Sequence, residues 1–212
     1  VGDEGGFAPN LFTNADALEL MALVIKNSNY RLGQDLFLGL DVAADEFYKN
    51  SAYSIKDSPK PLDQAGMINL YQTLMRDYSL LGIEDGLEQE DWAGWSKLSS
   101  SLPSGVMIIG DDLVSTNAKR LQKAIDNKSC NAVIVKPNQI GTITETIELM
   151  RLAEKNNITT IVSHRSGETN DFFIADFAVG MGASYAKFGA PDRGERVAKY
   201  NRLLEIESFL GK

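Results

Sequence analysis

Three acidic residues of this chain each follow an apolar run that has the length of a β-strand. These residues are Asp41, Glu84 and Asp111, and the three runs are consecutive candidate strands. If the strand ends meet, three carboxylates come together, and such a group calls for a hard divalent cation, with Mg²⁺ the natural candidate. Each acid alone could equally be a turn residue or a helix N-cap. The same position on three successive strands favours the metal site.

Two of these acids belong to acidic pairs, Glu84-Asp85 and Asp111-Asp112. Neighbouring side chains on a strand point in opposite directions. We therefore expect one member of each pair to face the site, and the pattern leaves open which one.

Two lysines end later candidate strands in the same way. Lys136 follows the run 132–135, and Lys187 follows 183–186. A lysine beside another cation loses its proton more readily, so it can act as a base, and a charged lysine can bind carboxylate or phosphate. An ordinary solvated lysine fits poorly after the apolar run before Lys136, but it remains a competing interpretation for Lys187.

The segment 163–169 combines the only histidine of the chain, His164, with Arg165 and two serines, Ser163 and Ser166. A lone histidine at a strand end is usually a structural hydrogen-bonding residue. An adjacent arginine can bind phosphate through two hydrogen bonds. The neighbours therefore favour an anion site, with Ser166 and the start of the next helix assisting.

Glu4 lies among glycines in the segment 2–6. Glycines allow a loop to fold closely over a ligand. An ordinary acidic turn is the alternative, and without the rest of the sequence it would be the preferred one.

The elements that must position these residues alternate along the chain. Six candidate strands are apolar runs without alternation, the last of them weaker, which is typical of parallel strands buried on both faces; they are residues 36–40, 80–83, 106–110, 132–135, 160–163 and 183–186. Helical periodicity predicts helices over 14–26, 63–78 and 142–155, the last opening with the capping-box spacing of Thr142 and Glu145. The sequence therefore predicts an α/β fold.

The strand ends recur at intervals of about one βα unit, except for a longer first interval that we expect to hold a surface hairpin near Tyr53 and Ile55. A doubly wound open sheet would explain the alternation equally well. A candidate site residue follows every strand, and this favours a βα-barrel, because all strands of a barrel point their carboxyl ends into one mouth. Six of the eight strands of such a barrel are visible.

The composition excludes several other classes. Hydrophobic residues make up 43% and charged residues 24% of the 212 residues, as in globular proteins, and the net charge of −8 disfavours nucleic acid and anionic membranes as partners. The single cysteine, Cys130, is expected to be a small buried hydrophobe. We find no signal peptide or membrane span, which favours the cytosol. The lack of an initial Met predicts that the chain begins inside a larger protein.

Other catalytic and cofactor motifs are absent. One histidine excludes a His-x-x-x-His zinc site, and no Gly-x-Ser-x-Gly segment occurs. The segment 180–185 lacks the third glycine of a dinucleotide-binding loop, so we interpret it as a helix end and turn.

Six motifs, in order, resemble those of the enolases, and of bacterial enolases in particular. They are Val1-Gly2-Asp3-Glu4-Gly5-Gly6-Phe7-Ala8-Pro9-Asn10, Gly39-Leu40-Asp41-Val42-Ala43, Gly82-Ile83-Glu84-Asp85-Gly86-Leu87, Gly110-Asp111-Asp112-Leu113, Lys136-Pro137-Asn138-Gln139-Ile140-Gly141-Thr142 and Ser163-His164-Arg165-Ser166-Gly167-Glu168-Thr169. The resemblance covers residues 1–212. It implies a partial enolase-type βα-barrel, the C-terminal catalytic domain of a two-domain protein whose N-terminal domain and first barrel strands lie upstream.

The resemblance implies the magnesium-dependent dehydration of 2-phosphoglycerate to phosphoenolpyruvate in glycolysis. By the matching motifs, Mg²⁺ would be held by Asp41, Glu84 and Asp111, Lys136 would take the α-proton, and Glu4 would protonate the departing hydroxyl. The substrate's phosphate and carboxylate would be held by Lys136, Ser163, His164, Arg165, Ser166 and Lys187. A lysine or histidine base with Mg²⁺ is the general pattern of this superfamily.

The resemblance also implies a cytoplasmic homodimer, with a cell-surface or secreted pool allowed. The chain departs from the family at Phe188, an apolar residue beside Lys187 where a threonine is usual. Two alternatives remain: another barrel lyase or a Schiff-base aldolase that uses Lys136, and a catalytically silent partial barrel that only binds metal, ligands or other chains.

Overall fold

The computed structural model describes residues 1–211. The chain divides into two compact units. We call Val1–Pro9, Val114–Leu121 and Val133–Lys212 the terminal unit, and Asn10–Leu113 with Gln122–Ala132 the central unit. Each unit is described by itself.

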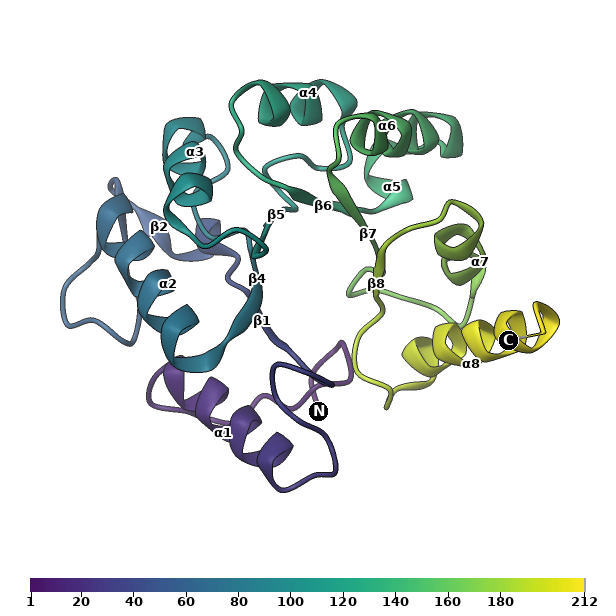
Figure 1. The fold of residues 1–212 in the computed structure, drawn as a ribbon, viewed down its shortest axis with the longest axis horizontal. Coiled ribbons are helices and arrows are strands. Elements are labelled where there is room, and N and C mark those ends of the chain that lie inside the picture. The colour runs from purple at the N-terminus through teal and green to yellow at the C-terminus, as the bar shows by residue number, and fades with distance from the viewer. Residues whose placement is uncertain (212) are drawn as a thin grey trace. The chain divides into compact units, whose positions relative to one another are not determined.

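Strands and helices alternate along the chain, as Figure 1 shows. The described residues contain six parallel strands, in the order β1-β4-β5 in the central unit and β6-β7-β8 in the terminal unit. These strands are β1 (Leu38–Asp41), β4 (Leu80–Glu84), β5 (Met107–Gly110), β6 (Ala132–Val135), β7 (Thr159–Ser163) and β8 (Tyr185–Lys187). The predicted α/β class and the six strands are confirmed, and they are consistent with part of a βα-barrel.

The three helices predicted over 14–26, 63–78 and 142–155 are each present within one residue of those bounds. The longer helices are α1 (Ala15–Lys26), α2 (Gln64–Tyr78), α3 (Trp92–Ser101), α4 (Ala118–Asp126), α6 (Ile143–Lys155), α7 (Phe173–Gly180) and α8 (Gly194–Phe209); α5 (Pro137–Ile140) and the 3₁₀ helix η1 (Ala44–Phe47) are single turns. Thr142 is the predicted N-cap of α6, because its hydroxyl accepts a hydrogen bond from the Glu145 N–H at 3.2 Å. The Glu145 carboxylate accepts the Thr142 hydroxyl at 2.6 Å, rather than the backbone N–H of a complete capping box.

The predicted hairpin is present between β1 and α2. It pairs β2 (Tyr48–Lys49) with β3 (Ala52–Tyr53) in antiparallel fashion, while Ile55 lies outside both strands. The turn residues Asn50 and Ser51 both have positive φ, as a two-residue hairpin turn of this kind requires. The hairpin accounts for the long first interval.

Burial follows the apolar pattern of the sequence. In the central unit, one cluster joins helices to strands through Leu18, Ile25, Leu38, Leu74 and Leu80. All four residues of β6 are completely buried, as expected for a parallel strand covered on both faces. Cys130 is 6% exposed, and burial raises the pKa of its thiol to about 12, so it is the predicted small hydrophobe.

The segment after α7 is the predicted helix end. The Ala183 N–H donates to the Ala178 carbonyl, Gly182 has φ +65°, and the chain continues into β8 rather than into a helix. Among the described residues, no helix is both long and apolar enough to cross a membrane.

Candidate active site

The acids predicted to bind metal lie at the carboxyl ends of three neighbouring strands. Asp41 of β1 and Glu84 of β4 are register partners, and Glu84 in turn pairs with Ile109 of β5, two residues before Asp111. Glu84 and Asp111 are buried, with 5% and 8% of their surface exposed, whereas Asp41 is exposed. The parallel strands therefore bring the three backbones to one edge, as parallel strands must. That their carboxylates share an ion stays a prediction.

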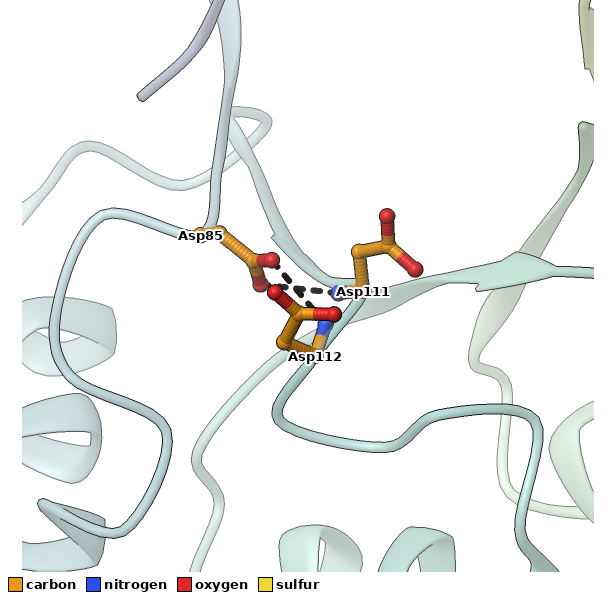
Figure 2. Close-up of side chains that lie close together, drawn as sticks. All are labelled: Asp85, Asp111 and Asp112. Carbon is orange, nitrogen blue, oxygen red and sulfur yellow. Dashed lines mark hydrogen bonds between the residues drawn. The ribbon is translucent and has the colours of Figure 1, made fainter. Parts of the chain in front are cut away.

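A second set of acids lies closer together. Within residues 1–211, carboxylate oxygens of Asp85, Asp111 and Asp112 lie within 4.8 Å of one another (Figure 2). The Asp85 carboxylate accepts the backbone N–H groups of Asp111 and Asp112, each at 2.9 Å. Asp85 thus ties the end of β4 to the turn after β5, and Asp111 belongs to both sets.

The pair Glu84-Asp85 does not follow the alternation expected along a strand. Asp85 adopts a left-handed backbone conformation with φ +44°, and both residues are buried. The alternation rule holds only for extended backbone, so it does not apply at this position. In the other pair, Asp111 is buried and Asp112 is exposed.

These carboxylates have the chemistry of a site for a hard cation. Burial raises the pKa of Asp85 to about 7; the two N–H donors oppose the rise, and the charges of Asp111 and Asp112 add to it. Crowded carboxylates disfavour one another's ionised form, and a divalent cation with oxygen ligands relieves that cost. The carboxylates at the ends of β4 and β5 therefore have the chemistry that binds Mg²⁺.

Glu4 lies in a loop that is closed by its own backbone. The Gly2 N–H donates to the Gly6 carbonyl at 2.7 Å, and the Glu4 carbonyl accepts the Ala190 N–H at 2.8 Å. The Glu4 carboxylate accepts the Ser166 hydroxyl at 3.1 Å, and its other oxygen lies 3.3 Å from His164 Nε2. The loop thus brings Glu4 together with two other predicted site residues, His164 and Ser166, which lie about 160 positions away in the sequence.

The charge state of Glu4 follows from these neighbours. Partial burial raises the pKa of Glu4, but His164, the Ser166 hydrogen bond, Lys187 and Arg196 outweigh burial, so the pKa lies below its usual value. Burial lowers the pKa of His164, against the opposing effect of Glu4. At neutral pH His164 is therefore mainly uncharged, whereas the Ser166 hydrogen bond, Lys187 and Arg196 still favour the carboxylate form of Glu4.

Strands β7 and β8 position the other anion-binding candidates. Ser163 and Lys187 are register partners, and the His164 N–H donates to the Lys187 carbonyl at 2.9 Å. Ser163 is 1% exposed and donates its hydroxyl proton to the His164 carbonyl at 3.0 Å. Arg165 and Ser166 are more accessible, which suits contacts with an anion that enters from solvent.

Lys136 directly follows β6 and is the N-cap of the single-turn helix α5. Its backbone N–H donates to the Thr116 hydroxyl at 2.9 Å. The Arg165 guanidinium donates to Asn138 of the same turn at 3.0 Å, so the segments that carry Lys136 and Arg165 are joined. A cavity of about 420 Å³ opens beside them, lined in part by Asn138, Ser163 and Arg165.

The side chain of Phe188, the residue that follows Lys187, packs into the core. It is 1% exposed, and its ring meets Tyr200 of α8 edge-on with centroids 6.3 Å apart. Successive residues of an extended chain point in opposite directions, so the bulk of Phe188 is taken up by the core.

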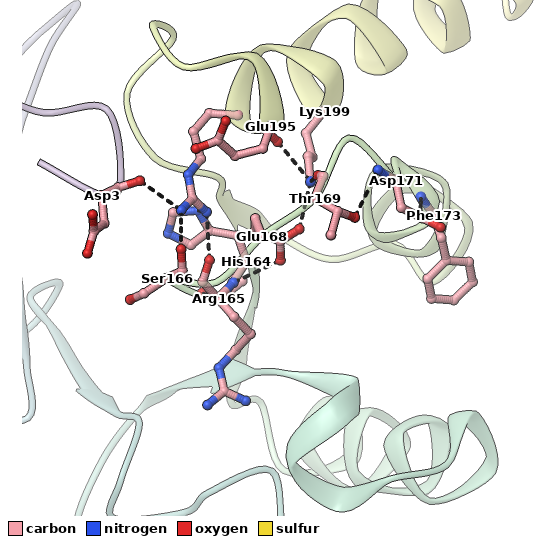
Figure 3. A network of polar contacts seen from close by, with 12 residues as sticks. Asp3, His164, Arg165, Ser166, Glu168, Thr169, Asp171, Phe173, Glu195 and Lys199 are labelled. Carbon is pink, nitrogen blue, oxygen red and sulfur yellow. Dashed lines mark hydrogen bonds and ion pairs between the residues drawn. The ribbon is translucent and has the colours of Figure 1, made fainter. Parts of the chain in front are cut away.

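Sequence analysis missed two buried cations in α8. Arg196 and Lys199 are completely buried, and Lys199 pairs with Glu168 at 2.6 Å in the network of Figure 3. Glu168 also accepts the Arg165 N–H at 2.9 Å. The spacing of Arg196 and Lys199 places them on one helix face, but charged residues on a helix are usually solvated, and this spacing alone does not distinguish a buried face.

Gly189 allows the segments of this site to approach one another. It has φ +81°, and an added Cβ would lie 2.6 Å from the Glu4 carbonyl oxygen and 2.9 Å from His164 Cε1. We expect Gly189→Ala to lower the free energy of unfolding by about 2–4 kcal/mol, from backbone strain and crowding together. Urea unfolding measures this loss.

Gly182→Ala is the matched control for that substitution. Gly182 has φ +65°, and an added Cβ would meet no atom within 4 Å. Gly182→Ala therefore introduces the backbone strain without the crowding, and we expect it to lower the free energy of unfolding by less. Equal losses for the two variants would show that the close approach at Gly189 is unimportant.

Comparison with known proteins decides the family. A family model described as the C-terminal TIM barrel domain of enolase matches residues 1–212. The chain belongs to the enolase family. Two similar relatives are the enolase of Rubrobacter xylanophilus, 49% identical over 212 residues, and that of Natranaerobius thermophilus, 46% identical over 210 residues.

These alignments cover 100% and 99% of the chain but 49% of each relative. The chain spans about half the length of the enolases it matches. Membership of the enolase family confirms the resemblance seen in the six sequence motifs and the barrel architecture expected from the strand ends.

Proposed function

We propose that the protein to which this chain belongs is an enolase that converts 2-phosphoglycerate to phosphoenolpyruvate in a magnesium-dependent dehydration, as a lyase of glycolysis. The observation that carries the proposal is the position of Glu4. Its carboxylate contacts Ser166, 162 positions away in the sequence, and lies next to His164. The predicted proton donor and two predicted anion-binding residues are thus held on one framework.

The acids of the central unit would hold the metal. Asp41, Glu84 and Asp111 are the proposed ligands, and the Asp85 carboxylate fixes the backbone of Asp111 through a hydrogen bond. When bound, Mg²⁺ supplies positive charge that stabilises the negative charge developing on the substrate's carboxylate after loss of the α-proton.

The residues of the terminal unit would move the protons. Lys136 Nζ, at the end of β6, would take the α-proton, which requires it to be uncharged when substrate binds. Glu4 would deliver a proton to the leaving hydroxyl. Because the surroundings of Glu4 favour its carboxylate form, Glu4 must first take that proton from solvent, and it returns to the carboxylate form when the hydroxyl leaves as water.

Residues at or directly after the carboxyl ends of β6, β7 and β8 would bind the anionic groups of the substrate. The proposed contacts with phosphate and carboxylate come from Lys136, Ser163, His164, Arg165, Ser166 and Lys187. The Ser163 hydroxyl donates to the His164 carbonyl, so the hydroxyl must rotate away from that carbonyl to contact substrate. We further propose a cytoplasmic homodimer, on family membership alone.

The test is an assay of the full-length protein with and without Mg²⁺. We expect an ultraviolet-absorbing enol product from 2-phosphoglycerate only with Mg²⁺, because the carboxylates that would hold the ion cannot themselves stabilise an anion. Chelation should abolish the signal, and added Mg²⁺ should restore it. Activity undiminished by a chelator would refute the carboxylate-metal assignment, and trapping of a carbonyl substrate on Lys136 by borohydride would favour an aldolase instead.

A further inference from the structure

Arg196 of α8 is a buried guanidinium surrounded by site residues. It is 0% exposed. Its Nη1 donates to His164 Nδ1 at 2.7 Å and to the Arg165 carbonyl at 2.6 Å; its Nη2 donates to the carbonyls of Asp3 at 3.0 Å and Ser166 at 2.7 Å. One side chain therefore joins the Glu4 loop, His164 and the 165–166 loop.

The contact with His164 determines where the imidazole carries its proton. A guanidinium has only donors, so His164 Nδ1 must accept and cannot carry hydrogen. His164 is 2% exposed, and burial lowers its pKa, so the ring is neutral at neutral pH. The single ring proton is therefore on Nε2.

His164 Nε2 points toward Glu4. It lies 3.3 Å from a Glu4 carboxylate oxygen, and within residues 1–211 it has no partner of full hydrogen-bond geometry. Catalytic hydrogen bonds in ligand-free proteins are often long and tighten when substrate binds. An N–H at this position can donate to Glu4, whereas the other tautomer would direct a lone pair at the carboxylate.

We propose that Arg196 is a positioning residue for the reaction: it fixes the Nε2–H tautomer of His164, and that N–H holds the Glu4 side chain in place, so that Glu4, once protonated from solvent, can deliver that proton. The role of Glu4 rests on the proposed function, but the tautomer does not. The charged and titratable groups that act on His164 are Glu4, Arg196, Lys187 and Glu168.

The first test is the tautomer in the unsubstituted protein. Nitrogen-15 NMR of the full-length protein, with His164 assigned by the loss of its signals in His164→Gln, should show a pyridine-type Nδ1 and a protonated Nε2 at neutral pH. A protonated Nδ1, or an imidazolium, would overturn the proposal. This measurement needs no activity, so its outcome is independent of whether the protein is an enolase.

The second test compares two arginines of the same helix. Arg196→Lys keeps the charge, but it cannot serve four acceptors in a fixed fork. We expect kcat for dehydration to fall roughly 10²-fold, as for a small misplacement of a catalytic group, with KM little changed and exchange of the α-proton with solvent retained. The imidazole signals should show a mixture of tautomers.

Arg202→Lys is the control, because Arg202 of α8 pairs with Asp176 and takes no part in the site. It should leave kcat and the tautomer unchanged. Loss of exchange together with dehydration in a folded Arg196→Lys protein would indicate a general structural role and contradict the proposal, as would full activity. Should Arg196→Lys fail to fold, the tautomer of the unsubstituted protein decides.

Discussion

Lys136→Ala should abolish exchange of the substrate's α-proton with solvent in the full-length protein. The side chain proposed to take that proton is removed, and no water in its place has comparable basicity. A general base contributes up to about 10⁴-fold, so both exchange and dehydration should fall by roughly that factor. Exchange of deuterium from heavy water into 2-phosphoglycerate, followed by NMR, measures the first step directly.

Lys155→Ala is the matched control for this substitution. Lys155 ends α6 and is exposed, so its loss should change neither rate. The backbone N–H at position 136 donates to Thr116 whatever the side chain, and unfolding should therefore be little affected. A folded Lys136→Ala protein that still exchanges the proton would remove Lys136 from the role of base.

Glu4→Gln should separate the two steps of the reaction. The amide keeps the size of the side chain but has no acidic proton to give to the leaving hydroxyl. Dehydration should fall about 10²–10⁴-fold, the range for loss of a general acid. Exchange of the α-proton should persist, because Lys136 is intact.

The two substitutions together assign the two roles. Loss of exchange in Glu4→Gln with retained exchange in Lys136→Ala would reverse them. Glu154→Gln, an exposed acid of α6, is the control for replacing a glutamate by its amide. It should retain both activities, since it lies outside the proposed site.

The strands could be predicted because burial on both faces requires continuous apolar sequence. β6 illustrates this, since its predicted and observed bounds coincide and all of its residues are buried. β8 was less distinct in sequence: it is short, and Tyr185 is 47% exposed. The helix starts with capping residues, such as Thr142, were also predictable, because the cap is a local interaction.

Parts of the site depended on contacts that no local pattern reveals. The contacts of Glu4 with Ser166 and His164 join distant segments, and motif resemblance pointed to these residues where spacing could not. The alternation rule failed at Asp85 because its backbone is left-handed. The buried charges of Arg196 and Lys199 were missed because their cost is offset by carbonyls and by Glu168, which only the folded chain brings to them.

The Arg196 contact with the Asp3 carbonyl spans 193 positions. During translation, the loop that carries Glu4 is therefore synthesised long before α8, the helix that contacts it. At ribosomal elongation rates of 5–20 residues per second, that interval is on the order of 10–40 s. During it the first segment emerges without its anchor, and its glycine-rich, acidic composition suits an unsupported, hydrated chain. Glu4 is thus among the last of the candidate site residues to reach its final position, and a chain truncated before α8 would lack the Arg196 contact with the loop that carries Glu4.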